Sequence, residues 1–349
     1  MRASHSQSIG RSLAGSRIDA AQGGLSTPTL LGAADPFVRA RERLRAVAGS
    51  DATVLIEGET GTGKELAAKA VHAMSLRALQ PLVIINCAAI PDSLIEDELF
   101  GHARGAFTDA GQERVGLLQA ASRGTLCLDE IGSLSRRAQA TLLRVLQDKS
   151  FRPLGSTTEQ RTDARFIALT NTPLWDLVGA DLFRADLYYR LCVLPVRLPP
   201  LRERRDDILP LAQHFLEKHA RREQQVTTLS PTVQRLLMNY AWPGNIRQLE
   251  HAILRAAQLA AGTAVELEDL DLPGVTADLA RDASPENDDV SFTVLKRRTI
   301  EAFERQYLTR LMEQCRGNVT HVARKAQRER RDVGKLLKKY HIYPKSYTG

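Results

Sequence analysis

The sequence predicts an α/β protein in which a parallel sheet flanked by helices is followed by a helical lid subdomain and then by a small all-α unit. Short β-like runs alternate with longer amphipathic stretches over residues 29–200, the pattern of parallel strands joined by helical crossovers. Strand signals stop after Pro200, where apolar residues take helical spacing instead. A basic segment with helical patterns of its own occupies residues 293–349.

Residues 1–28 are rich in Ser, Gly and Arg and contain no apolar run, so they predict a disordered tail and not a signal peptide. The core at 29–200 then contains short apolar runs, each predicted to be a strand: Thr53–Glu57, Leu82–Asn86, Thr125–Asp129 and Arg165–Thr170. Amphipathic stretches such as 113–121 and 136–148 lie between them and predict helices.

The lid subdomain, residues 201–270, is predicted to be helical. Apolar residues recur at helical spacing over 206–221, and Ser230 with Pro231 is a typical start of a helix. Asn245 can cap a further helix that runs to about Ala260. Residues 271–292 follow with six acidic residues, one basic residue and two prolines, which predicts an exposed linker.

The C-terminal segment, residues 293–349, is predicted to form a helix-turn-helix from helices at about 294–315, 319–326 and 330–340. It contains 15 Lys and Arg against 5 Asp and Glu, a charge of +10, whereas residues 1–292 carry −3. Such a concentrated excess is typical of a DNA-binding module. The basic residues expected to reach bases and phosphates of double-stranded DNA are Arg330, Arg331, Lys335 and Lys338.

The overall composition excludes several classes of protein. Hydrophobic residues make up 43% of the 349 residues and charged residues 26%, and no uncharged apolar run approaches the roughly 18 residues that a membrane span needs. The four cysteines lie far apart and have no metal-ligand spacing, which argues against a disulfide framework or a zinc site. We therefore expect a cytoplasmic protein with no membrane partner.

The first predicted strand leads directly into a phosphate-binding loop. The loop matches GxxxxGK, in which backbone N–H groups surround phosphate oxygens at a helix N-terminus and the lysine neutralises the β and γ charges. Its residues are Gly58, Glu59, Thr60, Gly61, Thr62, Gly63, Lys64 and Glu65. Glu65 stands where the usual Ser or Thr would hold magnesium, so the metal must be held differently. The sequence therefore predicts binding of ATP.

Two carboxylates end the third predicted strand of the core. Asp129 at the strand tip can hold hydrated Mg²⁺, and Glu130 can polarise the attacking water. Asn86 and Asn171 follow neighbouring strands, and open α/β sheets bind ligands at such strand ends. For either asparagine taken alone, a turn or cap role is the simpler interpretation.

At this point the sequence resembles the AAA+ domain of bacterial enhancer-binding proteins, the ATPases that activate sigma-54 RNA polymerase. The segments that carry the resemblance occur in the family's order and spacing over about 29–262: GETGTGKE, NCAAIPDSLIEDELFGHARGAFTDA, GTLCLDEIGSL, FRADLYYRL, LPPLRERRDDI and WPGNIRQLEH. The segment at 293–343 is similar to the Fis-like domain that usually ends these activators. The resemblance implies an AAA+ P-loop core with a helical lid and a helix-turn-helix.

The resemblance also implies roles for single residues. Asp129 and Glu130 would be the Walker B pair, and Asn86 would restrain Glu130 until the nucleotide state changes. Asn171, with Thr170, occupies the sensor I position, and Arg247 matches sensor II. Arg184 and Arg190 match the arginines that reach the γ-phosphate of a neighbouring subunit; for either arginine, a surface ion pair with Asp181 or Asp186 is the alternative.

The loop at Gly105–Ala110 is, by the same resemblance, the element that engages sigma-54, with Phe107 and Thr108 making the contact. The family's second glycine is Asp109 here, which removes backbone freedom and adds a charge. Gly334 and Gln327 are further departures, within the helix-turn-helix. A loop altered in this way keeps a second interpretation open, in which the chain is a nucleotide-binding DNA regulator not coupled to sigma-54.

The function expected from these residues is ATP-driven activation of transcription. The chain would bind upstream DNA, assemble into a ring, expected to be a hexamer, and hydrolyse ATP with Mg²⁺ between subunits to remodel the sigma-54 holoenzyme. With about 28 residues before the core we expect no sensory domain there, so control would come from a regulatory protein in trans, from expression or from assembly. An unfoldase of the AAA+ class is a remaining alternative, against which the basic C-terminal helices and the GAFT-type loop argue.

Overall fold

A computed structural model describes residues 28–107, 110, 112–219, 227–273, 301, 304–305, 307–315, 317–340 and 342, together with the backbone of 16–19. The chain divides into two compact units, residues 1–280 and 281–349. None of the helices in the described part is both long and apolar enough to cross a bilayer.

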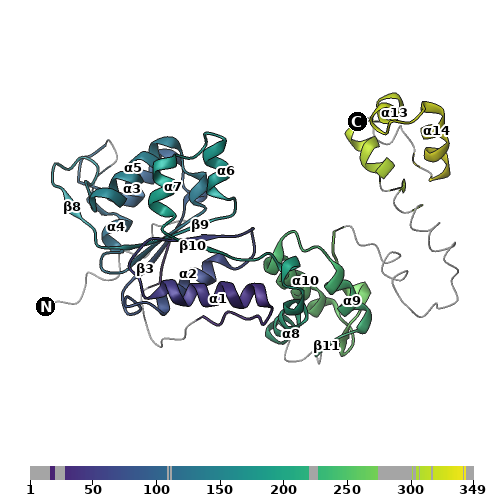
Figure 1. Cartoon of the computed structure of the whole chain (residues 1–349), viewed down its shortest axis with the longest axis horizontal. Helices are drawn as coiled ribbons and strands as arrows, with labels where there is room; N and C mark the ends of the chain where they lie inside the picture. The colour runs from purple at the N-terminus through teal and green to yellow at the C-terminus, as the bar shows by residue number, and fades with distance from the viewer. Residues whose placement is uncertain are drawn as a thin grey trace. The chain divides into compact units, whose positions relative to one another are not determined.

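A six-stranded sheet forms the centre of the first unit (Figure 1). Its strands, in order across the sheet, are β1 (Ser16–Asp19), β3 (Leu82–Asn86), β6 (Thr125–Asp129), β9 (Arg165–Thr170), β2 (Val54–Glu57) and β10 (Leu194–Arg197). All neighbours are parallel except β1, which runs antiparallel to β3. The four strands expected from apolar runs are thus confirmed, and a parallel sheet results.

Strand side chains alternate between two hydrophobic layers, because successive residues of a strand point to opposite faces. Leu55 of β2 packs in one layer, while Val54 and Ile56 pack in the other. Helices α1 (Asp35–Ala48) and α2 (Lys64–Ala73) cover the second face. The first face is covered by α3 (Asp92–Phe100), α4 (Leu117–Ala120), α5 (Arg136–Asp148), α6 (Leu174–Gly179) and α7 (Ala185–Leu191) (Figure 1).

Three features of this unit differ from expectation. Strand β1 lies inside the segment predicted to be a disordered tail, since Ser16–Asp19 pairs with β3 at the sheet edge. Strand β10 was not foreseen. The stretch 113–121, predicted to be one helix, is divided between β5 (Arg114–Val115) and the short α4, because Gly116 lies between them with extended backbone. The other tail residues before 28 lie outside the described residues.

Two short hairpins project from the sheet. Strand β4 (Gly101–His102) pairs with β5 and carries the loop that contains Phe107. Strand β7 (Ser150–Phe151) pairs with β8 (Gln160–Arg161). The two hairpins touch, because Ala103 N donates to Leu154 O at 2.9 Å and Leu154 N donates to Gly101 O at 2.8 Å.

The lid contains α8 (Ile208–His219), α9 (Pro231–Asn239) and α10 (Asn245–Leu259), with β11 (Thr228–Leu229) paired to β12 (Ala264–Val265). They enclose a separate core around Trp242, which is fully buried. The Ser230 side chain accepts from Val233 N and caps α9 as predicted. The predicted cap at Asn245 is wrong: Gly244 is the cap residue, and the Asn245 side chain points toward the phosphate-binding loop instead.

The start of the predicted linker packs with the lid, since Leu272 belongs to its core and Pro273 O accepts from Tyr240 Oη at 3.1 Å. Residues 274–292 of that linker lie outside the described residues. In the second unit, 307–314 are helical, and the rest of the predicted helix from 294 is described only in part. Helices α13 (Val319–Lys325) and α14 (Arg330–Lys339) share a small core with it.

Candidate functional site

The phosphate-binding loop joins β2 to α2, the order that the sequence predicted. Gly61 and Gly63 have φ values of +81° and +96°, a region that favours glycine. A Cβ at Gly61 would lie 2.2 Å from the carbonyl oxygen of Gly244, so no other residue fits there. Thr62 Oγ1 donates to Glu59 O at 2.8 Å and closes the turn. Helix α2 begins at Lys64, so the N–H groups of its first turn point toward the loop.

Lys64 is buried at the base of the loop. Its Nζ donates to the carbonyls of Gly58 at 2.7 Å and Glu59 at 3.1 Å. Burial lowers the pKa of this ammonium group, and the carboxylates of Asp129 and Glu130 oppose that effect. Lys64 thus lies between the loop and the strand-tip acids. Glu65, by contrast, faces solvent and forms an ion pair with Lys69 at 3.0 Å.

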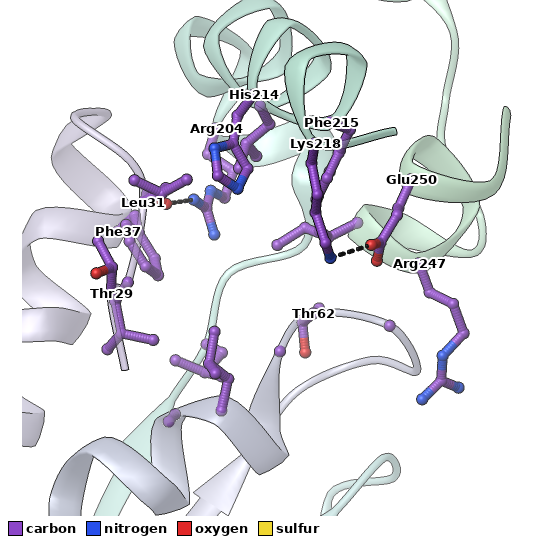
Figure 2. Close-up of a pocket in the computed structure, with 18 of the residues that line it drawn as sticks. Thr29, Leu31, Phe37, Thr62, Arg204, His214, Phe215, Lys218, Arg247 and Glu250 are labelled. Carbon is purple, nitrogen blue, oxygen red and sulfur yellow. Dashed lines mark hydrogen bonds and ion pairs between the residues drawn. The ribbon is translucent and has the colours of Figure 1, made fainter. Parts of the chain in front are cut away.

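A cavity of 390 Å³ opens beside this loop, between the core and the lid (Figure 2). Its volume lies within the ~300–1,000 Å³ typical of ligand sites. Thr62 and Gly63 of the loop line it, facing Phe37 of α1. The lid contributes apolar and charged side chains from α8 and α10: Leu211, His214, Phe215, Lys218, Ile246, Arg247, Glu250 and His251. A cavity with apolar and charged walls that ends at a phosphate-binding loop can accept a nucleotide.

The wall of the cavity includes residues that the sequence analysis missed. Arg204, only 1% exposed, donates from Nε to Asp207 at 2.8 Å and from its guanidinium to Leu31 O at 2.9 Å (Figure 2). The same guanidinium lies 3.6 Å from the centre of the Phe37 ring. Asp207 in turn accepts from the N–H groups of Ala33 and Ala34. Arg204 and Asp207 therefore attach the lid to the segment that precedes α1.

The strand-tip acids lie where the sequence predicted. Asp129 ends β6, and its Oδ1 accepts from Glu130 N at 2.9 Å. Burial raises the pKa of Asp129, and Lys64 opposes this rise. Glu130 has φ +53°, which turns the chain sharply after the strand. No group of three or more His, Cys, Asp or Glu able to hold a metal occurs in the described part of the chain. A cation here would depend on Asp129 together with phosphate oxygens, as Mg²⁺ commonly does.

Asn86 lies directly beside Asp129, since the two residues are paired in the β3–β6 register. Its amide oxygen accepts from Ala88 N at 2.9 Å and Ala89 N at 3.2 Å, the local cap role considered above. Among the described residues no hydrogen bond joins Asn86 to Glu130. Restraint of Glu130 by Asn86 therefore stays a prediction.

Asn171 follows β9 at the same edge of the sheet. The Thr170 carbonyl accepts from Gly58 N at 3.2 Å, which links this strand to the start of the phosphate-binding loop. Thr170 Oγ1 donates to Thr172 O at 2.6 Å, and Asn171 Oδ1 accepts from Thr172 Oγ1 at 3.2 Å. The sensor I position is thus adjacent to the loop, and Asn171 is exposed.

Arg184 and Arg190 do not line the cavity of their own chain. Arg184 forms an exposed pair with Asp186, with nitrogen–oxygen distances of 3.0 and 2.7 Å, whereas Asp181 pairs with Arg136. Arg190 donates to the Leu146 carbonyl at 3.2 and 3.1 Å. Arg247, from the first turn of α10, does line the cavity, and Figure 2 shows its side chain extending past the loop that carries Thr62.

Phe107 is 46% exposed on its loop, as expected of a contact residue. Thr108 and Asp109 lie outside the described residues. In the second unit, Arg330, Arg331, Lys335 and Lys338 are all exposed on α14. Lys335 lies 3.9 Å from Asp332, an ion pair within α14 itself.

Comparisons with known proteins agree with this geometry. A family model described as "Sigma-54 interaction domain" matches residues 30–197, and one described as "AAA+ ATPase lid domain" matches residues 202–285. The anaerobic nitric oxide reductase transcription regulator NorR of Salmonella paratyphi C is 44% identical over 320 residues, 89% of this chain and 62% of its own length. The transcriptional regulatory protein ZraR of Klebsiella oxytoca is 45% identical over 292 residues, 83% of this chain and 64% of its own.

This chain therefore spans less than two thirds of the length of either regulator. Among solved structures, NtrX from Brucella abortus in complex with ADP is similar with a TM-score of 0.64 and 31% identity, covering 90% of this chain and 69% of that one. NtrX in complex with ATP gives the same TM-score and identity and covers 70% of that chain.

Proposed function

Because the chain belongs to the family of sigma-54-dependent transcriptional regulators, we propose that it is an activator that hydrolyses ATP to remodel the sigma-54 RNA polymerase holoenzyme. The observation that carries this proposal is the cavity lined by Thr62 and Gly63 of the phosphate-binding loop and by α8 and α10 of the lid. Lys64 follows directly in the chain, and the carboxylate of Asp129 is close enough to affect its pKa. NtrX, a relative of known structure, binds ATP and ADP. We assign the same ligands to this cavity.

ATP would place its base among the apolar residues of the cavity and its phosphates on the loop. The loop N–H groups and the N-terminus of α2 would bind phosphate oxygens, and Lys64 would exchange its carbonyl partners for the β and γ phosphates. Arg247 extends from the lid toward the same region and would add a positive charge to it. These are the groups that the chain supplies for binding.

Asp129 would hold the hydrated Mg²⁺ that accompanies ATP, and that ion would neutralise charge on the phosphates. The raised pKa of Asp129 supports this role. Burial makes the ionised carboxylate less stable, and a bound cation would stabilise that ionised form again. Glu130 would orient and polarise the attacking water. Asn86 at the end of β3 and Asn171 just after β9, the two strands that flank β6, would sense the nucleotide state.

We assign Arg184 and Arg190 to the active site of a neighbouring subunit. Both are absent from the cavity of their own chain, both belong to the α7 region, and neither is buried. An arginine supplied in trans contributes ~10³–10⁵ to the rate in other nucleotide hydrolases. Hydrolysis would then require assembly, for which we propose a ring, expected to be a hexamer.

The loop with Phe107 and Thr108 would contact sigma-54, and α14 would contact upstream double-stranded DNA. The exposure of Phe107 supports the first assignment, and the exposure of Arg330, Arg331 and their neighbours on α14 supports the second. A regulatory protein acting in trans would set when the ring assembles. We place this activity in the bacterial cytoplasm.

The test is open-complex formation by purified sigma-54 holoenzyme on a pre-melted promoter, with ATP or without it. A pre-melted promoter removes the need for the unknown DNA site. We expect ATP-dependent open complexes with the full chain and none with Lys64→Ala. Hydrolysis without open complexes would refute the coupling to sigma-54.

One observation favours a second candidate, a nucleotide-binding DNA regulator that is not coupled to sigma-54. Asp109 replaces a glycine of the family's loop. The variant Asp109→Gly, assayed beside the natural sequence, separates the two. Rescue of open complexes by the glycine would locate a defect in the loop, and inactivity of both proteins with hydrolysis intact would favour the second candidate.

A further inference from the structure

We propose that Asn245 is a positioning residue that ties the phosphate-binding loop to the lid, so that the lid turns when the loop responds to nucleotide. The inference rests on the proposed function and deepens it, since it names the connection between nucleotide state and lid position.

The side chain of Asn245 bridges two parts of the chain. Its Nδ2 donates to Thr60 O at 3.0 Å and to Glu59 Oε2 at 3.2 Å, both in the phosphate-binding loop. Its Oδ1 accepts from Leu201 N at 2.7 Å, at the start of the lid. The residue is 0% exposed, so solvent offers no substitute partner. Loss of any of these hydrogen bonds would leave a buried polar group unsatisfied.

The backbone of Asn245 is also unusual. Its φ of +50° lies in the left-handed region, which asparagine tolerates better than most residues but which is rarely adopted at the start of a helix. Strained conformations of this kind persist where the surroundings fix them, and they occur often at functional sites. Here the conformation directs the side chain away from its own helix and into the loop.

Neighbouring groups make the same connection. The N–H groups of Ile246 and Arg247, in the first turn of α10, donate to Gly61 O at 3.0 and 3.3 Å. Arg202, next to Leu201, forms an ion pair with Glu59 that has nitrogen–oxygen distances of 2.8 and 2.5 Å. This pair holds the pKa of Glu59 at about 2, so the glutamate stays charged. Three consecutive loop residues, 59–61, are therefore held by the lid.

The loop thus has two sets of contacts at once. Its N–H groups are the ones that nucleotide phosphates would bind, while its carbonyls at Thr60 and Gly61 bind the lid. A shift of the loop on nucleotide binding is passed to α10 through Asn245. Because Arg247 lies two residues beyond Asn245, the same shift sets where the Arg247 guanidinium meets the nucleotide.

The experiment measures the distance between core and lid in the full chain. Spin labels are placed at Leu76→Cys in the core and Leu259→Cys in the lid, which are 91% and 65% exposed, with Cys192→Ser and Cys315→Ser to prevent labelling there. Distances are recorded by electron–electron resonance without nucleotide, with ADP and with ATP. Equilibrium nucleotide binding is measured on the same samples.

The diagnostic variant is Asn245→Asp, which keeps the acceptor for Leu201 N but replaces the donor with a carboxylate beside Glu59. We expect the distance change to disappear, while nucleotide binding weakens by less than about tenfold because the loop and Lys64 are intact. The matched control is Asn239→Asp, an exposed amide of the same lid whose Nδ2 donates to Arg235 O within its own helix. It should behave as the natural sequence does.

A distance change in Asn245→Asp equal to that of the natural sequence would overturn the proposal. So would nucleotide binding by the natural sequence without any distance change. Should Asn245→Asp fail to fold, Glu59→Gln is the second variant, because it removes the ion pair with Arg202. We expect it to reduce the nucleotide-dependent change in the distance between core and lid. A distance change as large as that of the natural sequence would again overturn the proposal. Failure of the natural sequence to bind nucleotide would refute the proposed function itself.

Discussion

The imidazole ring of His102 lies 4.8 Å from the ring of Phe107, measured between centres, with the two planes at 64°. His102 is itself fixed, because its Nδ1 lies 2.6 Å from Asp97 Oδ1 and its Nε2 lies 3.1 Å from Gln112 O. Arg114 donates to the other oxygen of Asp97 at 3.1 Å. The exposed Phe107 ring therefore rests on a buried polar network at the base of its loop.

Replacing His102 by Ala should weaken open-complex formation while ATP hydrolysis persists. Edge-to-face aromatic pairs contribute ~0.5–1.5 kcal/mol, which corresponds to roughly a two- to tenfold change in the population of the oriented ring. The measurement is open-complex yield against ATPase rate, with Asp97→Asn as a second variant that releases His102 without removing it. Equal losses of both activities would show that His102 supports the fold and not the loop.

Replacing Glu130 by Gln should leave ATP binding intact and lower hydrolysis by ~10²–10⁴, because proton transfer from the attacking water is lost while the phosphate-binding loop is unchanged. Binding is followed by titration with ATP, and hydrolysis by phosphate release. The control is Glu42→Gln, an exposed acid of α1. Turnover at the natural rate would remove Glu130 from the catalytic role.

Replacing Asp129 by Asn should raise the thermal stability of the nucleotide-free protein at pH 7.5 and abolish Mg²⁺-dependent hydrolysis. Burial raises the folded-state pKa of this acid above its ordinary value of 3.8, so the ionised form is less stable in the folded state than in the unfolded state. That penalty is fully present above the folded-state pKa and disappears as the pH falls through 3.8.

The measurement is the melting temperature of both proteins at several pH values. The difference by which the melting temperature of Asp129→Asn exceeds that of the natural sequence should shrink as the pH is lowered toward 4. A lower melting temperature for the variant at pH 7.5 would contradict the prediction, and would mean that attraction to Lys64 outweighs the burial of Asp129.

The strands and the phosphate-binding loop could be predicted because their patterns are local. Runs such as residues 82–85 are apolar throughout and buried on both faces, so the sequence alone identifies them. Strand β10 is four residues long and contains Pro195, and β1 reads SRID, which is polar and depends on pairing with β3. Neither strand has a strong pattern of its own.

The contacts around the cavity could not be predicted, because their partners are remote in sequence. Asn245 bonds Thr60 O, 185 residues away, and so a local rule that favours asparagine as a helix cap gave the wrong role. Asp207 accepts hydrogen bonds from the N–H groups of Ala33 and Ala34, which lie more than 170 residues away in the sequence. The LRERRDD segment is conspicuously charged, but only the fold shows which of its charges are buried.

Replacing Asp207 by Ala should destabilise the lid by ~3–5 kcal/mol, because Arg204 would keep a buried charge without its partner. Both side chains are 1% exposed. Unfolding in urea is followed by the fluorescence of the buried Trp242 in a Trp175→Phe background. Arg137→Ala, which removes a pair whose arginine is 83% exposed, serves as the control and should cost less than ~1 kcal/mol. If both variants lose a similar amount of unfolding free energy, the buried Asp207–Arg204 pair is no more important to stability than an exposed one.

Replacing Lys338 or Arg331 by Ala should weaken binding to duplex DNA of any sequence and change its salt dependence. A side chain that contacts a phosphate displaces about one counterion from the DNA. Each variant should therefore make the negative slope of log K against log [salt] shallower by ~0.9. Arg39→Ala, an exposed arginine of α1, should leave the slope unchanged. Affinity is measured from about 50 to 200 mM salt, a range over which proteins with several phosphate contacts lose orders of magnitude in affinity. If both α14 variants keep the natural slope, the exposed charges on this helix do not contact DNA, and the basic C-terminal segment must serve another partner.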